Sequence, residues 1–257
     1  MGGAIKRAML PWLRLFRVVN LPTVPGDILV GAAAAMCWGG CGVASEHALE
    51  RIVLAAVSSV FLYLFGLVDN DIVGAATDKG RPIPGGEVSL RAAKIARGLC
   101  LVIGLSLLSS WTALASMIAA VSLVTAIAAY NRTKCPLLMG LCRGLNVLLG
   151  AAAVACVGGR VEASSRCVVA VAVVAFAWTV YIAAVTKYSE GEERDPARRR
   201  RVGMLVGGIV YLQLAALIVL TLASPRPEAL KPLLVAGAVL LVLLRAFRFA
   251  WPKVSAS

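Results

Sequence analysis

Acidic and amide side chains gather at the end of one long apolar stretch, in the order Asp69, Asn70, Asp71 and then Asp78. Ionisable groups are costly at membrane depth, and where they occur they usually mark a site. If the segment stays helical, Asn70 or Asp71, Gly74 and Asp78 share one broad face. Oxygen ligands on one face suit Mg²⁺, which proteins usually hold through one or two carboxylates plus substrate phosphates. The pattern favours such a site over its alternative, a helix end that leaves the bilayer into a polar loop.

Basic and amide residues that could hold the phosphate part of a ligand follow further along the chain. Arg81 begins the segment Arg-Pro-Ile-Pro-Gly-Gly, and Lys134 lies in the polar connection 129–136. Arg143 and Asn146 are three residues apart, on one face of the next apolar stretch. A membrane-embedded Arg needs a partner, which either an anionic ligand or headgroups reached by snorkelling would supply. Both alternatives for Arg143 stay open, and Asn146 favours a polar cavity.

Two further polar sets are expected on the same side of the membrane. One follows the sixth apolar stretch, where Lys187 is followed by Glu190 and Glu192. A run of arginines comes next, at 198–201, and by itself it is a common topological signal. The other set is Arg17 and Asn20, which precede the first apolar stretch. If all these segments share one membrane face, their side chains can meet in one site.

The elements that must position these residues are transmembrane helices. The chain is 60% hydrophobic and 15% charged, unlike a soluble domain. About 20 helical residues cross a hydrocarbon core of about 30 Å, and the apolar runs lack the alternation of a membrane β-barrel. The pattern predicts an all-α, polytopic transmembrane helical bundle of about eight spans. Their approximate ranges are 23–43, 52–75, 90–110, 112–130, 137–158, 166–186, 202–223 and 229–249.

The distribution of basic residues predicts the orientation. With eight spans and a cytoplasmic N-terminus, 21 of the 26 Lys and Arg residues fall on the cytoplasmic side. The remainder are Arg51, Arg160, Arg166, Arg226 and Lys231. We therefore expect a multi-pass protein of the inner or plasma membrane with both termini in the cytoplasm. Residues 1–20 are basic and amphipathic, which is typical of an interfacial helix. We treat residues 1–257 as a single domain.

The composition also argues against several other chemistries. His47 is the only histidine, so Ser-His-Asp and multi-histidine metal chemistry are not available. Most of the seven cysteines fall inside apolar stretches, where we expect them to pack as small hydrophobes. The net charge of +13 follows mainly from the topology and suits anionic membrane lipid. Nothing in the pattern calls for nucleic acid as a partner.

Asn70-Asp71 with Asp78, followed by Arg81-Pro82-Ile83-Pro84-Gly85, resembles the first aspartate-rich motif of the UbiA superfamily of intramembrane prenyltransferases. The resemblance continues through 130–136, 139–143 and the acidic segment after residue 186, so it covers nearly the whole chain. It is greatest to the divergent UbiA-like branch found in bacterial secondary-metabolite clusters and in algal relatives.

The resemblance implies a single UbiA-like domain with a central cavity that opens to lipid. It implies Mg²⁺-dependent transfer of an isoprenyl group from an isoprenyl diphosphate to a small lipophilic acceptor. It gives catalytic roles to Asp71, Asp78 and Lys134, and metal ligation to Asn70, Asp71, Asp78, Glu190 and Glu192. It assigns substrate binding to Arg17, Asn20, Arg81, Arg143, Asn146 and Lys187.

The acidic motifs depart from the family pattern. Gly74 stands where a further Asp is usual, and Tyr188 stands where the second motif would begin with an acid. Three functions therefore remain open. Prenyl transfer requires an acceptor pocket beside the metal site. A UbiA-type terpene cyclase requires aromatic residues around a closed cavity. A non-catalytic lipid-binding or export-associated membrane protein would tolerate loss of the carboxylates.

Overall fold

Helices make up nearly all of the secondary structure, and prolines mark where several of them begin. The computed structural model describes residues 2–39, 47–76, 80–109, 114–157, 160–161, 164–191, 195–225 and 227–255. Proline is the first residue of α2, α6, α8 and α9, a position where its missing N–H costs nothing. Asp195 caps α8 by accepting from the backbone N–H of Ala197 at 2.9 Å and of Arg198 at 3.1 Å.

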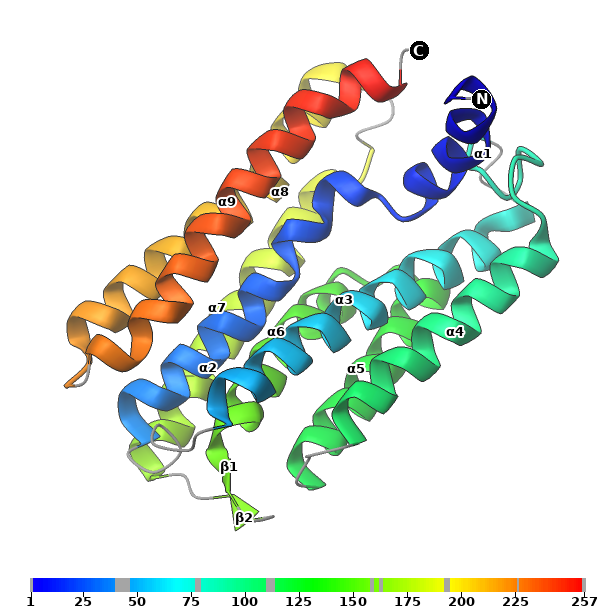
Figure 1. The fold of residues 1–257 in the computed structure, drawn as a ribbon. Coiled ribbons are helices and arrows are strands. Elements are labelled where there is room, and N and C mark those ends of the chain that lie inside the picture. The colour runs from blue at the N-terminus through cyan, green and yellow to red at the C-terminus, as the bar shows by residue number, and fades with distance from the viewer. Residues whose placement is uncertain are drawn as a thin grey trace.

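The elements follow one another as an up-and-down helical bundle (Figure 1). Between α6 and α7, a β-hairpin of two short strands, in which Cys156 pairs with Val161, interrupts the bundle. The helices are α1 Gly2–Leu15, α2 Pro25–Gly39, α3 Ala48–Val73, α4 Leu90–Ser109, α5 Leu114–Thr133, α6 Pro136–Ala155, α7 Ser165–Ser189, α8 Pro196–Ala223 and α9 Pro227–Ser255. The 3₁₀ turns are η1 Val18–Thr23 and η3 Gly74–Ala76, and the strands are β1 Cys156–Val157 and β2 Arg160–Val161.

The expected helical membrane fold is confirmed. Seven helical segments of the described chain are long and apolar enough to cross a membrane. They are Met9–Trp38, Ala48–Ala76, Leu114–Thr133, Pro136–Val154, Ser165–Ser189, Pro196–Ala223 and Pro227–Phe249. The one predicted span that is not among them is 90–110, which corresponds to α4 and lies along α3 (Figure 1). It carries Arg91, Lys94 and Arg97 in its first two turns, which lowers its apolar character.

The helix that was expected to carry the acidic motif ends earlier than the sequence suggested. Helix α3 stops at Val73, and η3 follows at Gly74–Ala76. Asp78 lies outside the described residues. The backbone N–H of Gly74 still donates to the Asn70 carbonyl, so the expected helical spacing holds from Asn70 to Gly74, and the expected place of Asp78 on this face stays a prediction.

Helix α6 is the centre of the bundle, since it packs against α2, α3, α5 and α7. Two glycines allow close helix packing on either side of it. A Cβ atom on Gly31 of α2 would overlap the backbone carbonyl of Val147, and one on Gly140 would overlap that of Thr179 in α7. Small residues at such contacts let membrane helices approach at backbone distance. The close packing fixes the part of α6 that carries Arg143 and Asn146.

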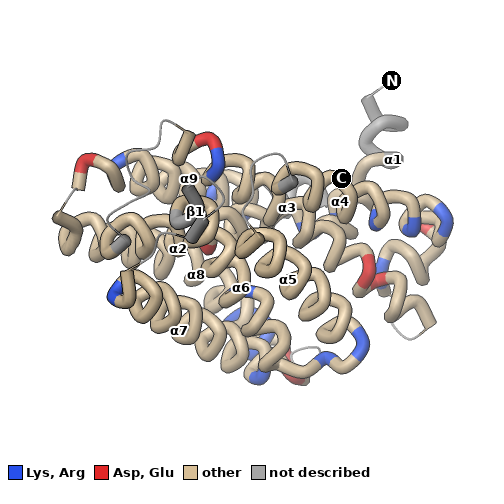
Figure 2. The backbone as a smooth tube through the Cα atoms, turned by 90° about the horizontal axis from the view of Figure 1, so that it is seen from below, with Lys and Arg blue, Asp and Glu red and all other residues tan. Residues whose placement is uncertain are grey.

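The two ends of the bundle differ in charge. The N- and C-termini and the connection from α3 to α4 lie at one end, and the β1–β2 hairpin lies at the other (Figure 1). Lys and Arg are more numerous toward the end that carries the termini (Figure 2). Helix α1 packs on this end, where Leu15 is buried with Val68 and Ile83.

Candidate active site

A cavity of about 190 Å³ lies between α3, α5 and α6, toward the end of the bundle that carries the termini. One part of its wall is apolar, with Leu67, Leu123, Ile127 and Met139. The other part is polar or basic. Its residues are Arg17, Ser59, Tyr63, Asn70, Arg81, Tyr130, Asn131, Lys134, Arg143 and Asn146. A basic region next to an apolar wall suits an amphiphilic anion.

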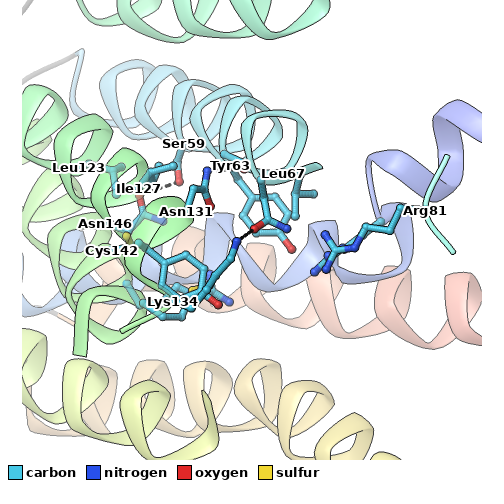
Figure 3. A pocket seen from close by; sticks show the side chains of 16 residues that line it. Ser59, Tyr63, Leu67, Arg81, Leu123, Ile127, Asn131, Lys134, Cys142 and Asn146 are labelled. Atoms are coloured by element: carbon cyan, nitrogen blue, oxygen red, sulfur yellow. Dashed lines mark hydrogen bonds between the residues drawn. The ribbon is translucent and has the colours of Figure 1, made fainter. Parts of the chain in front are cut away.

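Two of the cations point into this space from different sides. Lys134 comes from the connection between α5 and α6, and Arg81 comes from the segment before α4 (Figure 3). The Lys134 ammonium donates a hydrogen bond to the Asn70 side-chain oxygen and lies 5.7 Å from the Tyr130 ring centroid. Arg17 also lines the cavity and is exposed to solvent.

Lys134 and Arg17 share an unusual backbone conformation. Their φ angles are 55° and 43°, and they are the non-glycine residues with positive φ in the described chain. This left-handed region costs a residue with a Cβ of the order of 1–2 kcal/mol. Such strain collects at functional sites, where the surrounding structure enforces it. Both residues are cations that line the same cavity.

The carboxylates lie behind the basic residues and do not line the cavity in the described structure. Asp71 is 4% exposed and accepts a hydrogen bond from Arg81 at 2.6 Å. Asp69 accepts from Arg97 and from the Asn131 amide, each at 2.9 Å. These contacts hold Arg81 and Asn131 in place at the cavity wall.

Arg143 belongs to a buried network that the sequence did not reveal. It is 9% exposed and donates to the Asp27 carboxylate of α2 at 2.7 Å. Asp27 is fully buried and also accepts from the Trp178 indole at 2.9 Å and the Gln213 amide at 2.7 Å. Arg143 donates further to the Thr23 hydroxyl at 2.9 Å and the Thr23 carbonyl at 3.0 Å. Neither an anionic ligand nor lipid headgroups are therefore needed as the partner of Arg143, because an internal carboxylate already fills that role.

The predicted site residues divide into three groups. The cavity brings together Arg17, Asn70, Arg81, Lys134, Arg143 and Asn146, with Asp71 directly behind Arg81. A second group does not line it. Asn20 lies in η1, and Lys187 and Glu190 form an exposed ion pair at 2.7 Å at the end of α7. The third group, Asp78 and Glu192, lies outside the described residues.

Sequence reasoning missed several residues of the site. Ser59 donates to the Asn146 side chain at 2.9 Å, and Tyr63 and Asn131 line the cavity (Figure 3). Asp27 and Gln213 carried a usable signal, since each is a polar residue inside an apolar stretch. Ser59 and Tyr63 carried none, because such residues are ordinary in membrane helices.

The described side chains could supply only part of a metal site, and a bound substrate would have to supply the remaining oxygen atoms. No group of three or more His, Cys, Asp or Glu side chains converges within the part of the chain that the structure describes. Asn70 turns its amide oxygen to the cavity, and Asp71 is the next residue. One amide and one carboxylate agree with the way proteins hold Mg²⁺, where phosphate oxygens and water supply the other ligands.

Comparison with known proteins agrees with the geometry. The model of the UbiA prenyltransferase family matches residues 28–257. The chain belongs to the UbiA prenyltransferase family. This assignment confirms the resemblance of the sequence motifs to that family. No curated protein sequence gives a significant match to this UbiA-family chain.

Solved structures of UbiA-type proteins share the fold at low sequence identity. A UbiA homolog from Archaeoglobus fulgidus is 18% identical, with a TM-score of 0.55 over 94% of this chain and 88% of its own. The same homolog bound to GPP and Mg²⁺ is 17% identical, with a TM-score of 0.56 over 93% and 86%. A structure described as digeranylgeranylglyceryl phosphate synthase is 19% identical, with a TM-score of 0.56 over 96% and 88%.

Proposed function

We propose that this protein transfers an isoprenyl group from an isoprenyl diphosphate to a small lipophilic acceptor inside the membrane. The observation that carries the proposal is the cavity wall, where Arg17, Arg81, Lys134 and Arg143 adjoin an apolar surface. No carboxylate lines this cavity within the described residues, and Asp71 and Asp27 pair with Arg81 and Arg143 from behind its wall. A diphosphate with a hydrocarbon tail matches both parts of the wall. The Archaeoglobus homolog bound to GPP and Mg²⁺ supports this choice of ligand.

The basic residues would serve the departure of the diphosphate. The bond between the allylic carbon and the diphosphate oxygen breaks, and the diphosphate keeps the electron pair. Lys134 and Arg81 point at the space where that negative charge would collect (Figure 3). Donors that are fixed before the reaction stabilise developing charge without reorganisation. Asp71 and Asn70 would orient these two cations through the contacts that they make with Arg81 and Lys134.

We propose that Asn70 and Asp71 bind Mg²⁺ together with the diphosphate, for which their oxygens would exchange the contacts with Lys134 and Arg81 for the metal. When bound, the metal would neutralise charge on the diphosphate oxygens as a Lewis acid. Asp78, Glu190 and Glu192 were predicted as further ligands and remain a proposal. Glu190 pairs with Lys187 in this structure, so it and Lys187 would have to change partners before they could reach a diphosphate.

The apolar wall would hold the prenyl tail and protect the allylic cation from water. Leu67, Leu123 and Ile127 continue the cavity away from the basic groups. An acceptor that reaches the cavity from the membrane forms the new bond to the allylic carbon and loses a proton. Tyr63 and Tyr130 are the aromatic side chains of the described wall. Transfer to an acceptor therefore fits this cavity better than cyclisation, which relies on an aromatic lining.

We also propose that the end of the bundle with the termini faces the cytoplasm. The excess of Lys and Arg at that end agrees with the positive-inside rule (Figure 2). In this orientation the basic part of the cavity lies near the cytoplasmic surface, where a water-soluble diphosphate group can enter.

A binding experiment tests the proposal. The purified protein in Mg²⁺ is titrated with an isoprenyl diphosphate and with the matching prenyl alcohol. Loss of a charge-assisted contact costs about 1.5–3 kcal/mol, so Lys134→Ala should weaken diphosphate binding about tenfold to hundredfold. It should leave the alcohol nearly unchanged. Lys94→Ala, an exposed lysine of α4 that does not line the cavity, is the matched control. Equal weakening of both ligands by Lys134→Ala would contradict a diphosphate-binding role.

A further inference from the structure

A second hollow lies on the outer surface between α7 and α8. Helix α7 packs closely on α6 but makes far fewer contacts with α8, which leaves a groove of about 650 Å³. Its residues are Tyr181, Tyr188, Arg201, Met204, Leu205, Gly208, Tyr211 and Leu212. From Arg201 to Leu212 the groove follows about 16 Å of α8, at 1.5 Å per residue. None of its residues lines the candidate active site.

The groove is apolar along its length and basic at one end. Met204 and Leu212 are exposed within it, and the Tyr181 hydroxyl is bonded to the Leu205 carbonyl at 3.1 Å. At the end where α8 begins, exposed Arg201 contacts Tyr188. The Arg198 guanidinium lies 5.4 Å from the centroid of the same ring.

Arginines of α9 add to the positive charge of this side. Arg248 donates to the Gly203 carbonyl at 2.9 Å, near Arg201, whereas Arg245 donates to the Tyr211 hydroxyl at 2.6 Å, near the other end of the groove. The described acids nearby are already engaged. Glu190 pairs with Lys187, and Asp195 caps α8. The basic end of the groove therefore keeps a net positive charge among the described residues.

We propose that this groove binds one anionic membrane phospholipid. Its phosphate would lie against Arg201 and Tyr188, and one acyl chain would follow Met204, Gly208 and Leu212. Basic pockets between membrane helices bind anionic headgroups, and tyrosines favour the level of the headgroups. A free phosphate would not use the apolar groove, and a neutral lipid would not use the arginines. The combination selects a lipid with an acidic headgroup.

Native mass spectrometry tests the proposal on the full chain in detergent. Phosphatidylglycerol and phosphatidylcholine with identical acyl chains compete for the purified protein. We expect the first bound lipid to be phosphatidylglycerol. Each basic residue near a membrane surface contributes about 1 kcal/mol, so Arg201→Gln should reduce the preference about fivefold. Arg166→Gln, which removes an exposed arginine at the opposite end of α7, is the matched control and should leave the preference unchanged.

A second variant tests the acyl chain. A Cβ on Gly208 would be in ordinary contact with the Tyr181 hydroxyl at 3.7 Å, so a larger side chain can enter the groove from there without a backbone clash. Gly208→Leu should fill the groove and weaken both lipids several-fold, and glycerol phosphate alone should not compete. Three results would overturn the proposal: no preference in the wild type, an equal effect of Arg166→Gln, or competition by glycerol phosphate with no effect of Gly208→Leu.

Discussion

The ion pair between Asp27 and Arg143 should stabilise the bundle because Asp27 is fully buried and Arg143 is nearly so, at the wall of the cavity. Asp27→Asn removes the carboxylate and leaves the guanidinium, which is 9% exposed, without its counter-charge. Removing one partner of a buried pair typically costs about 3–5 kcal/mol. The variant also weakens the hydrogen bonds that Trp178 and Gln213 donate to the same carboxylate. That cost is a large part of a typical unfolding free energy of about 5–15 kcal/mol.

A double-mutant cycle separates the pair from its surroundings. Asp27→Asn, Arg143→Met and the double variant are unfolded by denaturant in detergent micelles. Each single change should lower the unfolding free energy by about 3–5 kcal/mol. The double variant leaves no unpaired charge. Its loss of unfolding free energy should therefore be about 2 kcal/mol smaller than the sum of the losses in the two single variants.

An exposed ion pair supplies the control for this cycle. Lys231 and Glu228 lie 2.6 Å apart, with side chains 61% and 77% exposed. Glu228→Gln should change the unfolding free energy by less than about 1 kcal/mol. Additive losses in the Asp27 and Arg143 cycle would refute the reasoning. They would mean that the two charges do not depend on each other and that Arg143 has another partner.

Three further outcomes are expected. Lys134→Gly should lose diphosphate binding but keep an unfolding temperature close to that of the wild type, because glycine adopts the positive φ at this position without strain. A large drop in the unfolding temperature would instead show that the lysine has a structural role. Asp71→Asn should abolish the Mg²⁺-dependent part of diphosphate affinity, and an equal loss in Mg²⁺ and in EDTA would show that Asp71 acts only by orienting Arg81 and does not bind the metal. A reporter fused to the C-terminus should be active in the cytoplasm, and a signal from the opposite compartment would invert the orientation.

Local chemistry made much of the fold and part of the site predictable. Apolar runs of the right length located the helices, and polar residues at membrane depth pointed to Asn70, Lys134 and Arg143. All three line one cavity. These signals are readable because hydrocarbon penalises each polar group separately, so each one needs a local reason.

The partners of those residues depend on tertiary packing, so the sequence could not give them. Asp27 and Arg143 are 116 residues apart and meet only because α2 and α6 pack at backbone distance. The same holds for Asp71, which was predicted to face a ligand. In the structure it binds Arg81, because the segment before α4 folds back over the end of α3. Lys187 and Glu190 were expected at the cavity, but α7 lies beyond α6 and its end pairs these two with each other.

Release of pyrophosphate tests the proposed transfer most directly. The purified protein is incubated with Mg²⁺, a panel of isoprenyl diphosphates and lipophilic acceptors, and pyrophosphate and prenylated product are quantified together. If the protein transfers a prenyl group, pyrophosphate and prenylated product should form in equal amounts. Their formation should require both an acceptor and Mg²⁺, and it should be lost in Lys134→Ala. Release without acceptor would point to cyclisation or hydrolysis. No release from any diphosphate by a folded protein would contradict the proposed prenyltransferase activity.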